Sequence, residues 1–334
     1  MRPTVSVQVW VILGAATLAF LGTTSHASSS VRVCQAEPPA CESQTVQTPF
    51  PAQPTLALQT DIFAMGADGS NQTDLTMDPD WDSTPSWSPD GRRIAYERDT
   101  TNAEIWVMRA DGSHQSALTH DPSAYDQDPA WSPDGRKIAF ARRTPTGGSG
   151  IYVMNARGSG RTQLVRLTTN TTQDDSPSWS PDGTKIAFTR LVAGSEEHIL
   201  VMNADGSDQT DLSSANGLTQ TLDPTWSPDG THIAFAGRNA GDYDIYVMNA
   251  DGSSPQDISQ SPGAIDYQPA WSPDGAKIAF MRETEGSPDW EIYDMNPDGT
   301  EQTDLTNDPA HPDYSPAWSP EGHLAFARYL DSTL

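Results

Sequence analysis

Residues 129–140 read PAWSPDGRKIAF, and the core of this stretch, Trp-Ser-Pro followed by Asp or Glu and then Gly, occurs six times in the chain. Successive copies begin 44 to 48 residues apart, at Trp87, Trp131, Trp179, Trp226, Trp271 and Trp318. Because a repeat period in the forties is typical of β-propellers and similar arrays, each copy predicts one unit of such an array.

A second motif, close to Ile-Tyr-Val-Met-Asn-Ala-Asp-Gly, alternates with the first. Its methionines are Met65, Met108, Met154, Met202, Met248 and Met295. Six copies of each motif predict six units, which together occupy about 270 of the 334 residues.

The unit that spans residues 126–168 has the pattern of four short strands. Residues 129–132 are extended, the Pro-Asp-Gly stretch at 133–135 is a turn signal, and 137–140 resume as a strand. The β-branched and aromatic residues 151–154 form a third strand, before a fourth at the end of the unit. No segment shows helical spacing of apolar residues. The sequence therefore predicts an all-β fold, a six-bladed β-propeller of four-stranded antiparallel blades.

The two ends of the repeat region each hold half a unit. Residues 61–76 supply only a third and a fourth strand, whereas residues 318–328 supply only a first and a second. Pairing these ends would complete the sixth blade and leave no free sheet edge. We therefore expect the ring to close through its N- and C-terminal strands.

The motif Pro-x-Trp-Ser-Pro-Asp-Gly-x-x-Ile-Ala-Phe resembles the TolB-type, WD-40-like propeller repeat, and the resemblance covers about four fifths of the chain. It implies a TolB-like interaction scaffold rather than a particular chemistry. TolB proper carries a folded domain before its propeller, and that place is occupied here by a proline-rich stretch. Residues 320–322 begin a turn that is one residue shorter than the others, which should alter its hairpin.

The N-terminal region reads as an export signal and a tether. Residues 1–27 combine Arg2, an apolar run at 5–21 and a small-x-small cleavage site, so they predict a signal peptide, with an uncleaved anchor as the alternative. Residues 28–55 are proline-rich and predict a flexible tether, and 56–334 form the propeller. We expect a periplasmic or extracellular monomer with no stable membrane span after signal cleavage.

The formal net charge is −26. Phosphate contacts require clustered Lys and Arg, so this charge argues against nucleic acid as a partner.

The six connections between blades hold twelve Asp and no Lys or Arg. Five of these Asp stand five residues before a motif Trp, and the fourth unit has Thr221 there and an Asp two places later. We expect these six carboxylates to ring the mouth of the channel and to bind Ca²⁺ or a basic peptide or protein segment. The alternative is that each Asp caps its own turn. The candidate residues are Asp82, Asp126, Asp174, Asp223, Asp266 and Asp313.

Aromatic residues outside the motifs lie near these connections and suit sugar stacking or protein anchoring, with loop packing as the alternative. They are Trp81, Tyr125, Tyr243, Tyr267, Trp290 and Tyr314. No Gly-x-Ser-x-Gly stands in a strand-to-helix context. The sequence thus favours an exported, non-catalytic propeller that binds a protein, peptide or glycan in the cell envelope, with no cofactor other than Ca²⁺.

The alternative function is a metal-dependent lyase or hydrolase that acts at the channel. The histidines that such a site would use stand at different positions of the repeat, which disfavours a shared site. They are His114, His120, His198, His232, His311 and His323.

Overall fold

The computed structural model describes residues 59–145, 148–156, 164–169, 172–192, 196–213, 217–238, 241–284 and 289–330. These residues belong to one compact unit, Thr55–Leu334. The predicted signal peptide and nearly all of the predicted tether lie outside the described residues. Among the residues described, no helix has the length and apolar character needed to span a membrane.

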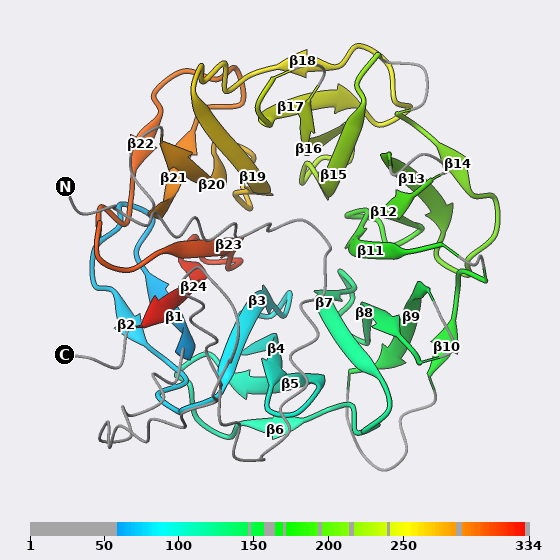
Figure 1. The fold of residues 1–334 in the computed structure, drawn as a ribbon, viewed down its shortest axis with the longest axis vertical. Helices are drawn as coiled ribbons and strands as arrows, with labels where there is room; N and C mark the ends of the chain where they lie inside the picture. The colour runs from blue at the N-terminus through cyan, green and yellow to red at the C-terminus, as the bar shows by residue number, and fades with distance from the viewer. Residues whose placement is uncertain are drawn as a thin grey trace, which may run out of the picture. The chain divides into compact units, whose positions relative to one another are not determined.

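The described residues form twenty-four strands, which are arranged in a ring as six antiparallel blades (Figure 1). Blade one holds β3 (Trp81–Trp87), β4 (Arg93–Asp99), β5 (Ala103–Arg109) and β6 (Ser116–Ala117); blade two β7 (Tyr125–Trp131), β8 (Lys137–Arg143), β9 (Ser149–Asn155) and β10 (Val165–Arg166); blade three β11 (Asp174–Trp179), β12 (Lys185–Leu191), β13 (Glu197–Asn203) and β14 (Thr210–Asp211); blade four β15 (Gln220–Trp226), β16 (His232–Arg238), β17 (Asp244–Asn249) and β18 (Gln256–Asp257); blade five β19 (Ala264–Trp271), β20 (Ile278–Thr284), β21 (Trp290–Met295) and β22 (Thr303–Asp304); and blade six β23 (Asp313–Trp318), β24 (Leu324–Leu330), β1 (Gln59–Met65) and β2 (Thr73–Asp74). The predicted fold class is confirmed.

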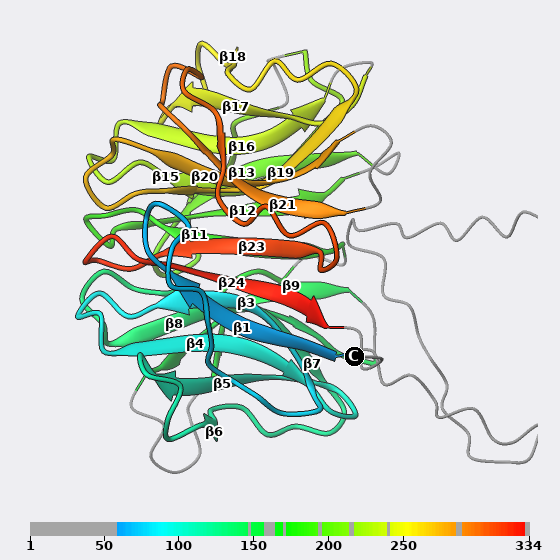
Figure 2. The ribbon, with the colours of Figure 1, turned by 90° about the vertical axis from the view of Figure 1, so that its left-hand side faces the viewer.

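Blade six is assembled from both ends of the described chain. Strand β1 pairs antiparallel with β24 over seven positions, from Gln59 opposite Leu330 to Met65 opposite Leu324. Strand β2 completes the outer edge, and β23 lies toward the centre of the ring (Figure 1), while Figure 2 shows β1 and β24 side by side. A single parallel bridge joins β1 to β3, so blades six and one form one continuous sheet. The ring thus closes through the predicted pairing of its first and last strands.

The hydrophobic core is divided into clusters that lie between neighbouring blades. In one of them, Ala95 and Ile105 of blade one contact Trp131, Ile138 and Phe140 of blade two. Because each blade buries both of its faces in this way, a chain with few apolar residues can still fill a core.

The innermost strand of each blade begins earlier than the sequence predicts. Each contains a Pro, which argues against a central strand. The Pro is tolerated because each strand is the channel-side edge of its sheet and shifts its register at the Pro, for example between Ser83 and Ser86 in β3. Parts of the predicted connections are therefore strand.

The hairpin of blade six is altered, in line with its one-residue deletion. The Ser319 N–H donates to the carbonyl of His323, four residues on, whereas the Ser88 N–H of blade one donates to the carbonyl of Arg93, five residues on. In four other blades the Gly of this turn lies against the Pro of the preceding blade's turn. At the junction of blades six and one, the Glu321 carboxylate takes the place of that Pro.

Candidate binding site in the channel

Five of the six predicted site carboxylates form buried ion pairs with arginine. In each pair the Arg Nε donates to the Asp Oδ1 over 2.6 to 2.7 Å, and a second nitrogen donates to the other oxygen. The pairs are Asp82–Arg98, Asp126–Arg142, Asp174–Arg190, Asp266–Arg282 and Asp313–Arg328. Each of these five carboxylates is therefore neutralised by an arginine of its own blade.

The arginines come from the second strand of each blade, at the position that faces the Asp on the first strand. The sequence analysis counted charges only within the connections and therefore missed them. The signal was present, because an Arg follows each of these Asp by 15 or 16 residues. Burial raises the pKa of Asp82 to about 6 and that of Asp313 to about 7, while the paired guanidinium acts in the opposite direction.

Blade four lacks this ion pair. Thr221 stands at the position of the Asp and faces Gly237, which stands at the position of the Arg. The Thr221 hydroxyl donates to the carbonyl of Glu197 and accepts from the N–H of Ile199, both over 3.2 Å. Blade four therefore lacks both members of the ion pair, so no unpaired Asp or Arg is left at these two positions.

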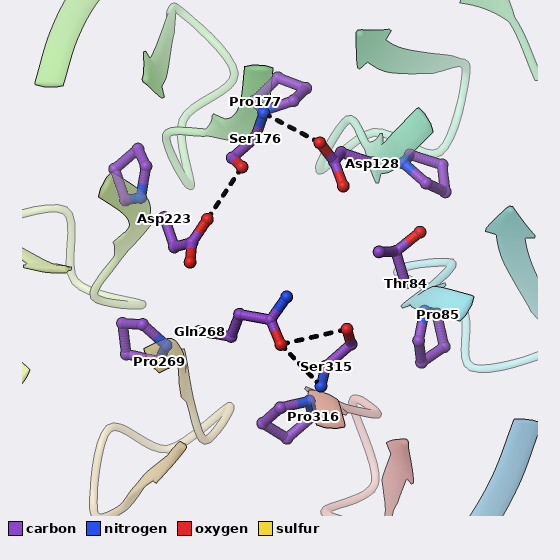
Figure 3. A pocket seen from close by; sticks show the side chains of 12 residues that line it. Thr84, Pro85, Asp128, Ser176, Pro177, Asp223, Gln268, Pro269, Ser315 and Pro316 are labelled. Carbon is purple, nitrogen blue, oxygen red and sulfur yellow. Dashed lines mark hydrogen bonds between the residues drawn. The ribbon is translucent and has the colours of Figure 1, made fainter. Parts of the chain in front are cut away.

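A pocket of about 140 Å³ lies in the channel and is built from equivalent positions of all six blades (Figure 3). Each blade contributes a Pro of its innermost strand and the polar residue before it. All six polar residues have a left-handed backbone, with φ between 48° and 57°. They are Thr84, Asp128, Ser176, Asp223, Gln268 and Ser315. Asp223 is thus the one predicted site residue that lines this pocket, and Asp128 is a second carboxylate that the sequence analysis did not single out.

The two carboxylates are linked through a serine that lies between them in the ring. The Ser176 hydroxyl donates to Asp223 Oδ1 over 2.9 Å, and the Ser176 N–H donates to Asp128 Oδ2 over 3.3 Å (Figure 3). Burial raises the pKa of both carboxyls to about 6, and their mutual repulsion adds to the shift of Asp128. Among the described residues that line the pocket, none is Lys or Arg.

Three further acidic side chains surround this pair. Burial raises the pKa of Asp175 to about 7 and that of Glu97 to about 8, and in both cases repulsion by Asp128 adds to the effect. The pKa of Glu197 is raised as well, by burial and by Asp175. A positive charge placed in the channel would therefore relieve repulsion among several carboxylates.

The predicted aromatic residues fall into three groups. Trp81 and Tyr125 begin β3 and β7 and are 36% and 37% exposed. Tyr267 lies between Tyr243 and Trp290, with ring centroids 4.7 and 5.9 Å away. Tyr314 packs into the core. Only the first two therefore present large exposed rings.

Within the described ranges, one group of potential metal ligands brings three carboxylates together, Asp61, Asp78 and Asp82. Arg98 donates hydrogen bonds to both Asp78 and Asp82, so a cation already occupies part of this group. No described histidine belongs to it; His198 contacts Asp211, and His311 contacts Asp308.

Comparison with known proteins supports the fold. The family model of the TolB β-propeller domain matches residues 55–221 and 198–331. A structure assigned to TolB of Agrobacterium tumefaciens is 24% identical with a TM-score of 0.69, covering 82% of this chain and 99% of its own. TolB from Acinetobacter baumannii is 21% identical, with a TM-score of 0.65 and coverage of 78% and 66%.

Enzymes share the fold at a greater distance. An oligogalacturonate lyase from Vibrio parahaemolyticus is 15% identical, with a TM-score of 0.53, and the match covers 79% of this chain and 76% of the lyase. No curated protein matches the sequence. Because the family model spans most of the chain, the protein belongs to the TolB β-propeller domain family.

Proposed function

We propose that this member of the TolB β-propeller domain family is an exported binding module without catalytic chemistry of its own. Its ligand is a protein, peptide or glycan of the cell envelope, and a peptide segment with a basic group fits the site best. The observation that carries the proposal is the channel pocket, where Asp128 and Asp223 face a space lined by no described Lys or Arg.

The charge of the channel supports a cationic ligand group. The acidic side chains of Glu97, Asp175 and Glu197 lie near the two that line the pocket, and repulsion contributes to their raised pKa values, so a nearby cation would favour the ionised forms of these carboxyls. An ammonium or guanidinium group would donate hydrogen bonds to the carboxylates of Asp128 and Asp223 and would lower this repulsion. Electrostatic attraction of this kind also speeds the encounter with a partner.

Exposed apolar side chains supply a surface on which the rest of a partner would lie. Met77 is 74% exposed, and it stands close in sequence to Trp81, whose ring is within 6.1 Å of that of Tyr329. Aromatic residues of this kind are common anchors in protein interfaces. Their presence favours a protein or peptide ligand over a bare cation.

Calcium remains the alternative occupant of the pocket. The pocket offers oxygen atoms from two carboxylates and from hydroxyl and amide groups, and Ca²⁺ binds ligands of these kinds. The metal-dependent lyase has less support, because the described histidines do not gather at the channel pocket.

A lysine-rich test peptide separates these ligands. We expect fluorescence anisotropy to detect its binding to the wild type, and the double variant Asp128→Asn, Asp223→Asn to bind on the order of tenfold more weakly, because two attractive charges are lost. The matched control Asp182→Asn, Asp229→Asn removes the same charge from exposed hairpin turns and should bind like the wild type.

Equal weakening in both double variants would show that the peptide responds only to total charge and would refute the channel site. Thermal unfolding in chelator and in millimolar Ca²⁺ tests the other occupant. A higher Tm with Ca²⁺, lost in Asp128→Asn, Asp223→Asn, would favour the metal.

A further inference from the structure

The turns that connect strands one to two and three to four of each blade lie at the same end of the blade, and we call this end the turn face. In blade one the two turns meet, because residues 90–93 and 109–111 together line an open pocket of about 630 Å³. This pocket is separate from the channel pocket, with which it shares no lining residue.

The turn face is dominated by ionised aspartates. Hydrogen bonds from neighbouring hydroxyl and backbone N–H groups lower the pKa of the Asp in ten of its turns. They are Asp68, Asp90, Asp111, Asp134, Asp182, Asp205, Asp229, Asp251, Asp274 and Asp298. An extended polyanion would be repelled by most of this face.

Blade one places three arginines within that acidic surface. Arg93 on β4 stands directly opposite Arg109 on β5, and Arg92 precedes it in the turn. The other blades avoid this arrangement, since they have Asn or Gly at the position of Arg109: Asn155, Asn203, Asn249, Asn296 and Gly66. Like charges directly opposite one another destabilise a strand pair, so Arg in place of Asn at position 109 should lower the free energy of unfolding.

The three guanidinium groups are arranged to leave their charge available. Arg93 is held in place, because its Nη1 donates to the carbonyl of Ala156 over 3.2 Å and its Cζ lies 4.5 Å from the ring centre of Trp131. Arg92 and Arg109 are exposed. Within the described part of the chain, none of the three has a carboxylate oxygen within salt-bridge distance.

We propose that this pocket, which we call the arginine pocket, binds a carboxylate group of an acidic peptide segment. Three arginines and the two aspartates Asp90 and Asp111 line it, which gives a formal charge of 3 − 2 = +1, and the Glu321 carboxylate lies against its Gly91. This small local charge suits a single carboxylate better than a doubly charged phosphate. The planar guanidinium presents paired donors that fit the two oxygens of a carboxylate. The acidic turns around the pocket would repel a ligand with negative charges along its length, so a ligand with one negative group is favoured.

The test uses a short synthetic peptide with one Glu between neutral residues, and its Gln counterpart. In low salt we expect the purified protein to bind the Glu peptide and not the Gln peptide. Arg109→Asn, which introduces the residue of four other blades, should weaken binding about tenfold or more, because a charge-assisted pair is lost. The same variant should unfold at an equal or higher Tm, because the opposing arginines are separated.

Arg136→Thr is the matched control. Arg136 occupies the place of Arg92 in blade two, is exposed, and is replaced in the control by the residue found at Thr184 and Thr231. We expect it to change the dissociation constant less than about twofold, since it lies outside the arginine pocket.

Equal weakening by Arg109→Asn and Arg136→Thr would overturn the proposal, because binding would then follow net charge alone. Binding of the Gln peptide as tight as that of the Glu peptide, or tighter binding of inorganic phosphate, would overturn the assignment to a carboxylate. Loss of Glu-peptide binding in Arg109→Asn together with an unchanged or raised Tm would support a site that is maintained at the expense of stability.

Discussion

Blade four and the other five blades differ in the side chains that face each other between their first two strands. Where five blades bury an Asp–Arg pair between their first two strands, blade four has Thr221 opposite Gly237. A Cβ on Gly237 would lie 3.0 to 3.1 Å from side-chain atoms of Phe235, Leu218 and Tyr246, so these apolar groups fill the space near the missing guanidinium. The comparison shows that the ion pair is a local device and is not required for a blade to form.

The largest effect should follow from breaking one ion pair. Asp266 is fully buried, and Asp266→Asn leaves the Arg282 guanidinium without its counter-charge. We expect the free energy of unfolding in urea to fall by about 3–5 kcal/mol. In blade four, Thr221→Val removes only hydroxyl hydrogen bonds and should cost about 1 kcal/mol. Similar losses at the two positions would contradict the assigned role of the pair.

A smaller effect should follow from converting blade five to the pattern of blade four. Removing both charges leaves neither one buried alone, so Asp266→Thr with Arg282→Gly should cost less than the sum of the single changes, with a coupling of roughly 1–3 kcal/mol. The lost packing of Arg282 on Phe280 and Tyr293 affects the single and the double variant alike. A double-mutant cycle in urea measures this coupling, and additive losses would show that the two groups act independently.

The smallest effect concerns the carboxylate that blade four does carry. Asp223 lies in the channel without an arginine partner among the pocket residues, and its pKa is raised to about 6. The folded protein then binds this proton more tightly than the unfolded chain does, so its contribution to stability is lost as the pH rises from about 4 through 6. Asp223→Asn should therefore stabilise the protein at pH 8 by about 1 kcal/mol more than at pH 4.5. Urea unfolding at the two values checks this, and a constant difference would disprove it.

The repeat pattern is sufficient to predict the fold because each blade repeats the same turns and the same apolar positions. The Trp-Ser-Pro-Asp-Gly hairpin identifies two strands, and the half units at the two ends predict the pairing of β1 with β24. Strand limits were less predictable, because a Pro next to Thr84 or Asp128 suggests a connection. The strands accommodate it through a left-handed residue and a register shift, which only the structure reveals.

The site was only partly predictable, for two physical reasons. The recurring Asp was recognised, but its partner stands on another strand. The sequence holds the recurring Arg, and the register that places Asp126 opposite Arg142 shows that this Arg neutralises the charge. The channel residues share a position in the repeat but not a chemistry, since Thr84 and Asp128 are equivalent. The sequence analysis searched five residues before each motif Trp, so it reached Asp223 only as the substitute for Thr221 and passed over the equivalent Asp128.

The pairing of β1 with β24 also joins two strands that are synthesised far apart in time. Gln59 and Leu330 are neighbours in the sheet but lie at opposite ends of the described chain. During synthesis, β1 is therefore among the first strands made and must wait for the last one, so its edge stays unpaired while the other blades assemble. Contacts between such distant residues form slowly, and unpaired edges are prone to aggregation. A chain that stops before Leu324 would lack β24, so it would have five complete blades and two open sheet edges.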